Sequence, residues 1–422
     1  MRMMFILSVV SVVIPASGVG SVLGAPMLQS IGVLDPANPA SAVTAISSDG
    51  TWAVGHSNGL DSAGTTSIRQ PIIWSQSTGL VQLPNTGDFN GEARGVAVKP
   101  DGYIGIAGYV YNTTLTTPLP KMHGYKALPS NLKGGTWTLC SGASTTGNDT
   151  VGPYNAARVK WLTDGTVTGD YLISGRRGNG ARGIAVTMDA NTYIDYPNGT
   201  PRVVANSVAS RLVNNSRPFG AGYDNGNPNG LRRALLVYTT SAPQLTIPGG
   251  VGYQSEALGV SPDGLFVAPG DASNAGVLCG YDQDVSGLPH AFIWKINDPA
   301  MTILGEAMGD NQSTAIDVRV IGGNWTAVGY SSDGITERAV MWLNGSMQPV
   351  LLSSLLAGAG VDTSGWASLS RITSMSDDGM TVAGWGIWAE DGSTRGFVAV
   401  IPEPAALSLL VLGGCALLRR RQ

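Results

Sequence analysis

The residues best suited to chemistry in this sequence are few and scattered. Three histidines occur, His56, His123 and His290, and none of them belongs to a His-x-x-x-His or His-Glu pair. Zinc sites need several His or Cys side chains at such spacings, so the sequence predicts no metal site of this kind. His290 begins an apolar strand, where a hydrogen bond to a neighbouring turn is a simpler interpretation than metal ligation.

Carboxylates provide the other candidate metal ligands. Asp282 and Asp284 are separated by one residue in a predicted loop, and Asp61, Asp377 and Asp378 lie in loops elsewhere. Loop carboxylates can bind calcium, but a complete loop motif adds further oxygen ligands and a bidentate Glu that are missing here. We therefore expect no cofactor. Asp282 and Asp284 are the candidate ligands if calcium binds, and solvated turn residues are the alternative.

No catalytic residue is predicted. Ser-Gly contexts such as residues 142–144 lack the Gly-x-Ser-x-Gly elbow of a serine hydrolase. Glycoside hydrolysis needs two carboxylates that face each other across a cleft, and a sequence alone does not pair them. One glycine-rich loop, residues 175–182, carries Arg176, Arg177 and Arg182. It either contacts an acidic polysaccharide or forms an exposed turn.

The N-terminus predicts an export signal at residues 1–24. Arg2 precedes an apolar core at residues 5–14, and small residues follow. A membrane-spanning helix needs about 20 apolar residues, so a cleaved signal peptide fits better than an uncleaved anchor. Cleavage is expected after Gly20 or Gly24.

The C-terminus, residues 402–422, combines three elements in a fixed order. They are the tripeptide Pro402-Glu403-Pro404, an apolar run at residues 405–418, and the cluster Arg419-Arg420-Arg421. This order resembles the PEP-CTERM sorting signal of bacterial exported proteins. The resemblance implies recognition of the tripeptide by an exosortase-type protease while the apolar helix is transiently inserted in the cytoplasmic membrane. The arginines stop transfer because they favour the cytoplasmic side.

Composition indicates an all-β protein between these ends, in residues 25–401. The chain has 58 glycines and only 13% charged residues, and helical periodicity is missing outside the termini. Its net charge is −4, and four of its 25 basic residues, Arg2 and the tail arginines, lie in the two terminal segments. Nucleic acid is therefore not an expected partner, because no basic stripe remains to contact phosphates.

Cysteine usage excludes a disulfide framework. Cys415 lies in the apolar tail, which leaves Cys140 and Cys279 in the body of the protein. A bridge between these two is compatible with an oxidising compartment, and two separate buried thiols are equally compatible with the sequence.

The body contains an internal repeat. Each unit consists of an apolar strand, an Asp-Gly turn, a second strand that ends in Gly and an aromatic residue, a polar loop, and a third strand. The clearest copy occupies residues 257–264, 277–281 and 290–294. Other clear copies begin near residues 45, 315 and 372, and fainter ones begin near residues 97 and 161 or are centred on residues 214–215.

Seven units of about 50 residues predict a β-propeller of about seven three- or four-stranded blades, because such a unit cannot bury both faces alone. An open β-solenoid or tandem β-sandwiches are the alternatives. The clearest copy reads His290-Ala291-Phe292 in its third strand, and the unit resembles the HAF repeat of extracellular bacterial proteins. That resemblance implies an extracellular repeat without an established reaction.

These features together predict an exported, non-enzymatic protein of the bacterial cell surface or extracellular matrix. In this hypothesis the repeats form an interaction platform, with extracellular polysaccharide as the expected partner. The alternative is a secreted propeller enzyme, either a polysaccharide lyase or a glycoside hydrolase. Convergence of polar residues from several blades on the central channel would distinguish the two hypotheses.

Overall fold

The computed structural model describes a subset of the chain, which lies between the two terminal segments. The described residues are 25–85, 90–112, 119–139, 159–161, 171–177, 182–187, 193–195, 203–213, 217–224, 231–237, 245–247, 253–261, 276–296 and 298–401. The predicted signal peptide, Pro402, Glu403, Pro404 and the arginines of the tail lie outside these residues.

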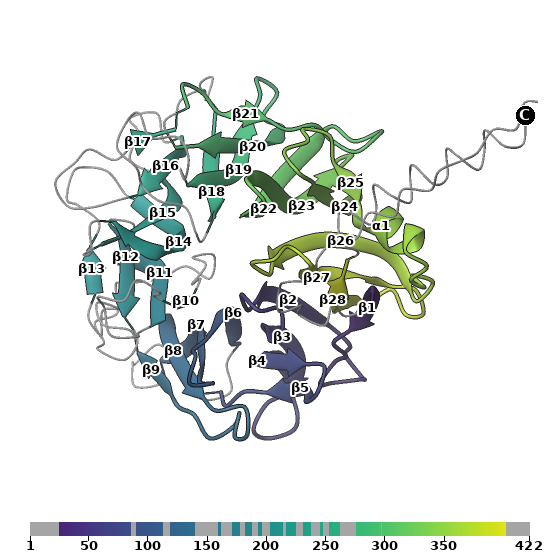
Figure 1. Ribbon diagram of the computed structural model, residues 1–422. Coiled ribbons are helices and arrows are strands. Elements are labelled where there is room, and N and C mark those ends of the chain that lie inside the picture. The colour runs from purple at the N-terminus through teal and green to yellow at the C-terminus, as the bar shows by residue number, and fades with distance from the viewer. Residues whose placement is uncertain are drawn as a thin grey trace, which may run out of the picture.

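The described strands form seven antiparallel four-stranded sheets, which are arranged as blades around a common centre (Figure 1). Blade 1 comprises β2 (Ser41–Ile46), β3 (Ala53–Leu60), β4 (Ser67–Ser75) and β5 (Gly79–Gln82); blade 2 comprises β6 (Glu92–Val98), β7 (Ile104–Asn112), β8 (Leu119–Ala127) and β9 (Trp137–Leu139). Blade 3 comprises β10 (Val159–Trp161), β11 (Tyr171–Arg177), β12 (Arg182–Thr187) and β13 (Tyr193–Asp195); blade 4 comprises β14 (Val203–Val213), β15 (Arg217–Asp224), β16 (Arg233–Val237) and β17 (Leu245–Thr246). Blade 5 comprises β18 (Ser255–Val260), β19 (Val277–Gln283), β20 (Pro289–Lys295) and β21 (Thr302–Ile303); blade 6 comprises β22 (Gln312–Ile321), β23 (Asn324–Ser332), β24 (Glu337–Trp342) and β25 (Val350–Leu351).

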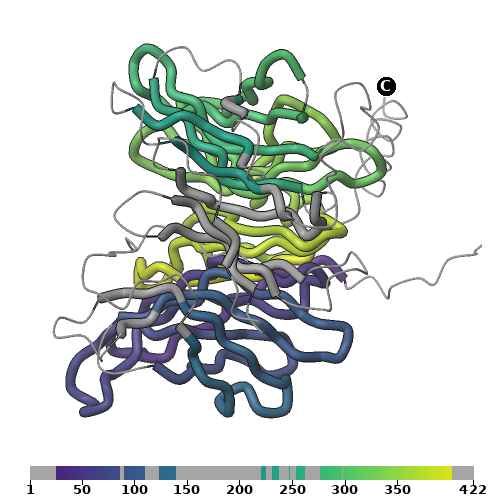
Figure 2. Tube along the Cα trace, turned by 90° about the vertical axis from the view of Figure 1, so that its left-hand side faces the viewer, coloured from purple at the N-terminus to yellow at the C-terminus, as the bar shows by residue number. Residues whose placement is uncertain are grey.

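Blade 7 joins the two ends of the described chain. Its strands are β26 (Trp366–Met375), β27 (Thr381–Trp388) and β28 (Thr394–Val400), and its outermost strand is β1 (Met27–Ser30). Met27 pairs with Val400 and Ser30 with Phe397. Figure 2 shows these N-terminal and C-terminal segments side by side. The ring is therefore closed by backbone hydrogen bonds between its first and last strands.

The recurring glycine of the second strand has a steric cause. In six blades the first strand contains a β-bulge at this height, with its register shifting between Val43 and Ala45 in blade 1 and between Ala205 and Ser207 in blade 4. Five of the glycines opposite these bulges are Gly55, Gly108, Gly280, Gly329 and Gly384. A Cβ at any of these positions would overlap a carbonyl oxygen of the first strand. The repeat keeps glycine there because the bulged backbone leaves no room for a side chain.

The Asp-Gly turn of blade 1, at Asp49-Gly50, is held by side-chain as well as backbone hydrogen bonds. Gly50 N–H donates to the Ser47 carbonyl, the Ser47 hydroxyl donates to Asp49 Oδ1 at 2.5 Å, and the Ser47 hydroxyl accepts from the Trp52 N–H. Only the glycine of the pair has a positive φ, which is +73° at Gly50. The aspartate contributes hydrogen bonds to its own turn and leaves the positive φ to glycine alone.

The core consists of apolar side chains between neighbouring blades. Third-strand residues such as Trp294 and Trp342 are at most 2% exposed and pack against the preceding blade. A buried ion pair within β22 of blade 6, in which Arg319 Nη1 lies 2.7 Å from Asp317 Oδ1, also contacts blade 7, because Arg319 Nη2 donates to the Met375 carbonyl of β26. The junctions of blades 4 and 5, 5 and 6, 6 and 7, 7 and 1, and 1 and 2 are thus packed by apolar side chains of two sheets.

The structure confirms the all-β propeller, with seven blades in the described residues and four strands in each. The sequence pattern locates three strands in each unit; the short fourth strand, which the predicted range of three or four allows, and the closure through β1 are seen only in the structure. One short helix, α1 (Leu352–Gly358), extends the connection after β25. No helix in the described part of the chain has the length and hydrophobicity of a membrane span.

Candidate functional site

Two faces of the propeller can be distinguished by their connections. We call the side where the first strand turns into the second the hairpin face, and the side where the second strand turns into the third the loop face. On the loop face, the residue after the second-strand glycine is aromatic in six blades. These residues are His56, Tyr109, Tyr223, Tyr281, Tyr330 and Trp385. They place aromatic rings near the start of the first strand of each blade, which is the innermost strand and is called the inner strand below.

The junction of blades 1 and 2 carries a charged cluster around Glu92. Glu92 is 4% exposed, and its carboxylate lies 3.2 Å from Arg69 Nη1 and 3.1 Å from Arg94 Nε. The Tyr109 hydroxyl donates to the same carboxylate at 3.2 Å. Burial alone would raise the pKa of Glu92, but the surrounding cations, led by Arg94, hold its pKa below the ordinary value. The carboxylate is therefore ionised and fully engaged.

His56 completes this cluster as a neutral side chain. Its Nδ1 lies 3.8 Å from Glu92 Oε2. Burial lowers the pKa of His56 to about 4, although the Glu92 charge acts in the opposite direction. His56 is therefore uncharged at neutral pH and adds no positive charge to the cluster.

A similar cluster surrounds Glu256 at the junction of blades 4 and 5. Arg232 Nη1 lies 3.0 Å from Glu256 Oε2, and the Arg232 guanidinium lies over the Tyr223 ring at 4.8 Å. The Tyr281 hydroxyl donates to Glu256 Oε2 at 3.2 Å. Burial, and then the Glu256 charge, raise the pKa of Tyr281 well above its ordinary value. Tyr281 therefore keeps its proton at neutral pH.

The third cluster, at the junction of blades 6 and 7, has its charges exchanged between strands. Arg371 now lies on the inner strand, and Glu337 lies at the start of the third strand of the preceding blade. Arg371 Nε donates to Glu337 Oε2 at 2.6 Å. The guanidinium lies 4.1 Å from the ring centroid of Tyr330 and 5.6 Å from that of Trp385. Its side chain is 33% exposed, so the fixed cation still faces solvent.

A pocket opens between the second and third clusters. At the junction of blades 5 and 6, Pro289 and Thr314 occupy the positions that Arg69 and Glu92 occupy at the junction of blades 1 and 2. The space left without an ion pair is a cavity of about 420 Å³. Its walls are Leu258, Tyr281, Gln283, Pro289, Thr314, Ile316, Tyr330 and Arg371.

The bulges of the inner strands help to shape this pocket. Leu258 and Ile316 are the extra residues at the register shifts of β18 and β22. Both side chains line the cavity. A bulge re-aims one side chain relative to a regular strand. The scaffold therefore provides two apolar side chains, while Gln283, Thr314, the two phenols and one arginine provide polar groups.

This arrangement favours an acidic, hydroxyl-rich ligand. Arg371 supplies a positive charge held in place by Glu337 and two aromatic rings, and arginine binds carboxylates in bidentate fashion. Tyr281 and Tyr330 supply two phenolic groups from neighbouring blades. Such a set can bind a carboxylate, present a proton donor, and exclude water on the apolar side.

On the loop face, the histidine of the His-Ala-Phe triplet fixes a loop through hydrogen bonds to two carboxylates. His290 Nε2 lies 3.3 Å from Asp284 Oδ2, and His290 Nδ1 lies 2.7 Å from Glu306 Oε1. Arg338 and Arg395 occupy the same position in blades 6 and 7 and pair with Asp333 at 2.8 Å and Asp391 at 2.6 Å. The prediction that His290 bonds to a neighbouring turn is confirmed. The residue at the first position of the triplet therefore holds the loop between the second and third strands, and arginine can replace histidine there because it also pairs with the loop aspartate.

The two carboxylates considered for calcium, Asp282 and Asp284, have different surroundings. Asp284 accepts backbone N–H groups of Ser286 and Leu288 and contacts His290. Burial raises the pKa of Asp282 to about 6, and its Oδ1 has no hydrogen-bond partner. Among the residues that the structure describes, no group of three or more His, Cys, Asp or Glu side chains suits a metal ion. Asp284 acts as a turn residue.

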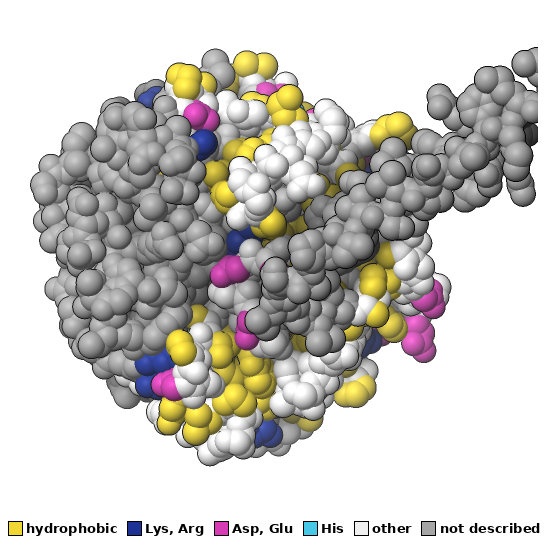
Figure 3. Space-filling model, in the orientation of Figure 1, with side chains coloured by type: hydrophobic (Ala, Val, Ile, Leu, Met, Phe, Trp, Pro, Cys, Tyr) yellow, Lys and Arg dark blue, Asp and Glu magenta, His cyan; other side chains and the backbone are white. Residues whose placement is uncertain are grey.

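The other residues considered in the sequence are dispersed. His123 is buried in blade 2, and Asp377 lies on the hairpin face beside Arg319 at 3.0 Å. Cys279 is buried in β19, and Cys140 lies outside the described residues. Residues 178–181 of the basic loop also lie outside them. On the face shown in Figure 3, acidic and basic side chains lie in small mixed groups.

The sequence analysis missed the residues that form the pocket. Tyr281 and Tyr330 were recognised as repeat positions, but no function was attached to them, and Arg371 was not singled out. Their recurrence after the second-strand glycine was a usable signal, because one repeat position always lies at the same height of a propeller. Pairing Arg371 with Glu337 required the order of blades, which the linear sequence does not show.

Comparison with known proteins gives the fold and no family. No family model and no curated protein matches the chain. Similar solved structures include the β-propeller domain of the Trilobed protease from Pyrococcus furiosus, with a TM-score of 0.48, 9% identity, and coverage of 85% of this chain and 93% of that one. They also include oligogalacturonate lyase from Vibrio parahaemolyticus, with a TM-score of 0.48, 12% identity, and coverage of 90% and 98%. A Trypanosoma rangeli sialidase has a TM-score of 0.37, 8% identity, and coverage of 77% and 56%.

These comparisons correct the expectation of a non-enzymatic platform. The similar propellers include a lyase, peptidases and a sialidase, so a repeat of this architecture gives no reason to expect a lack of catalysis. At such low identity the likeness shows the fold and assigns no reaction to this chain.

Proposed function

We propose that this chain is an exported propeller enzyme that cleaves an acidic polysaccharide by β-elimination at the loop-face pocket. The observation that carries the proposal is the fixed Arg371 cation beside the phenols of Tyr281 and Tyr330 in one cavity. The ligand class follows from this set, because a uronate combines a carboxylate with several hydroxyls.

Each of the three side chains has a role in elimination. Arg371 binds the uronate carboxylate and stabilises the negative charge that develops when the neighbouring carbon loses its proton. Tyr330, after it has released its own proton to solvent, acts as the base and takes that proton on its oxygen, and the electron pair of the broken C–H bond forms the new double bond as the glycosidic C–O bond breaks. Tyr281, which is protonated because its pKa is raised, gives a proton to the departing sugar oxygen.

Elimination fits this pocket better than hydrolysis. A glycoside hydrolase needs an acid and a base or nucleophile, which are usually two carboxylates on either side of the bond. The cavity walls contain no Asp or Glu. Glu256 and Glu337 lie behind Tyr281 and Arg371 and are engaged in hydrogen bonds with them. The carboxylates of the loop face therefore orient other groups.

Export is the second part of the proposal. The signal at residues 1–24 and the PEP-CTERM-like tail at residues 402–422 support delivery to the cell surface or medium, where acidic exopolysaccharide is the substrate. Mass spectrometry of the secreted protein should find a new N-terminus after Gly20 or Gly24 and loss of residues 405–422. A secreted chain that retains both segments would contradict this part.

The elimination is tested by incubating the purified chain with polygalacturonate, alginate and hyaluronan as probes. We expect ultraviolet absorbance from an unsaturated uronate with at least one polymer. Arg371→Gln and Tyr330→Phe should each lower that rate by about 100-fold or more, in line with the loss of one preorganised catalytic group.

The matched control is Arg395→Gln, which removes an arginine of the loop face that pairs with Asp391 outside the pocket. It should retain most of the rate. Saturated products would identify a hydrolase instead, and a folded protein that cleaves none of these polymers would refute the proposal.

A further inference from the structure

A second arginine lies beside the elimination pocket. Arg232 directly precedes β16 of blade 4, at the repeat position that Pro289 and Glu337 occupy in blades 5 and 6. Its Nη1 donates to Glu256 Oε2 at 3.0 Å, and the Tyr281 hydroxyl donates to the same oxygen at 3.2 Å. Tyr281 is a wall of the pocket. A single carboxylate group therefore joins Arg232 to the pocket wall.

Arg232 keeps donors available for a ligand. Its side chain is 42% exposed, and the guanidinium is held in position by Glu256 and by the Tyr223 ring, whose centroid lies 4.8 Å away. A guanidinium has five N–H donors, and the ion pair with Glu256 is made by Nη1. The exposed part of the group can therefore donate to a second carboxylate.

The surroundings of Arg232 mirror those of Arg371. Each guanidinium lies over a tyrosine ring and pairs with a glutamate. Arg232 belongs to blade 4 and Arg371 to blade 7, and the pocket with Tyr281 and Tyr330 lies at the junction of blades 5 and 6. The order of blades therefore places one fixed cation on either side of the pocket.

In the proposed elimination, Arg371 binds the carboxylate of the uronate that loses its proton, and Tyr281 gives a proton to the oxygen of the departing sugar. The departing sugar therefore lies on the Tyr281 side of the pocket, which is also the side of Arg232. We propose that Arg232 binds the carboxylate of this departing unit, so that the chain acts on polymers of consecutive uronates. This inference rests on the proposed function and narrows its substrate class.

The size of the pocket requires such a contact outside it. The volume of about 420 Å³ is near the lower end of the range for small-ligand sites. A polymer bound there must continue across the loop face beyond the cavity walls. A unit that carries a carboxylate gains a charge-assisted hydrogen bond from a fixed guanidinium, which a neutral sugar does not.

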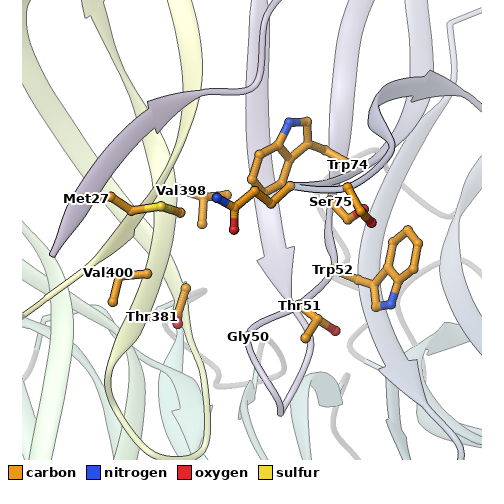
Figure 4. A pocket seen from close by; sticks show the side chains of 11 residues that line it. Met27, Gly50, Thr51, Trp52, Trp74, Ser75, Thr381, Val398 and Val400 are labelled. Carbon is orange, nitrogen blue, oxygen red and sulfur yellow. The ribbon is translucent and has the colours of Figure 1, made fainter. Parts of the chain in front are cut away.

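A second cavity differs from the loop-face pocket in its charge. It lies where β1, β27 and β28 face two turns of blade 1, and it has a volume of about 470 Å³ (Figure 4). Gly50 and Thr51 in its wall belong to the turn between the first and second strands, so it lies on the hairpin face. Its walls contain no charged side chain and offer no cation to a uronate. The acidic polymer is therefore expected on the loop face.

The subsite is tested by calorimetry with two oligosaccharides of equal length, tetragalacturonate and a hyaluronan tetrasaccharide, in which each uronate is followed by a neutral sugar. The Tyr330→Phe variant is used throughout, because it prevents cleavage and keeps a ring beside Arg371. In this background Arg232→Gln should weaken tetragalacturonate binding about fivefold to tenfold, as expected for a charge-assisted hydrogen bond at a partly exposed site. Binding of the hyaluronan fragment should not change. Arg232→Lys, which keeps the charge, should retain most of the tetragalacturonate affinity.

Arg69→Gln in the same background is the matched control. Arg69 occupies the equivalent position of blade 1, is 43% exposed and pairs with Glu92, but it is not among the residues lining the pocket. It should leave tetragalacturonate affinity unchanged, and circular dichroism checks that both variants are folded. Equal tetragalacturonate affinities of the Arg232→Gln and Arg69→Gln variants would overturn the inference, and so would equal weakening of both oligosaccharides by Arg232→Gln.

The inference and the proposed function fail in different measurements. A wild-type chain that cleaves none of the polymers refutes the elimination. Unchanged tetragalacturonate affinity in Arg232→Gln overturns the subsite, whether or not the wild-type chain cleaves a polymer.

Discussion

Two blade junctions on the loop face have different residues at equivalent positions, and the two junctions differ in structure as a result. At the junction of blades 1 and 2, Arg69 and Glu92 form an ion pair that Arg94, His56 and Tyr109 complete. At the junction of blades 5 and 6, Pro289 and Thr314 stand at those two positions, and the pocket opens beside them. The junction that has the ion pair is closed and joins its two blades, whereas the junction that lacks it leaves a cavity large enough for a ligand.

The difference shows how a repeat acquires a site. The propeller needs its inter-blade contacts at most junctions, because each blade buries its faces only against its neighbours. Removing the ion pair at one junction leaves the neighbouring Tyr281, Tyr330 and Arg371 lining an open space. Their own partners, Glu256 and Glu337, remain in place and hold them. Site formation therefore requires few changes to a structural position.

The largest expected effect is a difference in stability between variants of two carboxylates, Glu92 and Glu337. Glu92→Gln should lower the free energy of unfolding by about 2–3 kcal/mol, because it removes a buried charge and leaves the partly buried Arg94 and its neighbour Arg69 without their counter-charge. Glu337→Gln should cost about 1 kcal/mol or less, since that pair is partly exposed. Urea denaturation followed by circular dichroism measures both. Similar losses for the two variants would remove the distinction between a structural and a functional cluster.

The second prediction fills the pocket with the ion pair of the other junction. The double variant Pro289→Arg with Thr314→Glu should abolish at least about 99% of polymer cleavage, because the new side chains occupy the cavity. The melting temperature should change little. The control is Ser346→Ala, an exposed position that is not among the residues lining the pocket. Full activity in the double variant would place the active site elsewhere.

The sequence predicted the fold well because the repeat carries it. The strand order, the Asp-Gly turns and the glycine opposite each bulge are local features, and they recur often enough to count seven units. The outer strands such as β21 (Thr302–Ile303) are only two residues long and carry no periodicity. Closure through β1 was missed because it joins segments more than 360 residues apart.

The site was much harder to predict. Arg371, Glu337 and Tyr281 come from three blades, and nothing in their local sequence marks them as neighbours. The residues that looked reactive, His290 and Asp284, prove to hold a loop. A rare residue type attracts notice in a sequence, whereas this pocket is built from the common positions of the repeat.

The smallest expected effect contrasts two histidines of the loop face. Burial lowers the pKa of His56 to about 4, whereas hydrogen bonds to Glu306 and Asp284 outweigh burial and raise the pKa of His290 above its ordinary value. The stability that neutral His56 contributes is therefore complete above about pH 6.5 and is lost as the pH falls towards 4. The stability from charged His290 is complete below about pH 6.5 and is lost as the pH rises through its elevated pKa.

Titration of the histidine ring protons by NMR tests this contrast, with His56→Gln and His290→Gln to assign the two signals. We expect one signal to titrate near pH 4 and the other above pH 6.5. Hydrogen exchange should show that the loop after β19 opens more readily at alkaline pH. The equivalent loops of blades 6 and 7 should not change, because Arg338 and Arg395, which hold them, stay charged. Two coincident midpoints would show that the Glu92 cluster is hydrated and that its junction is open like the pocket.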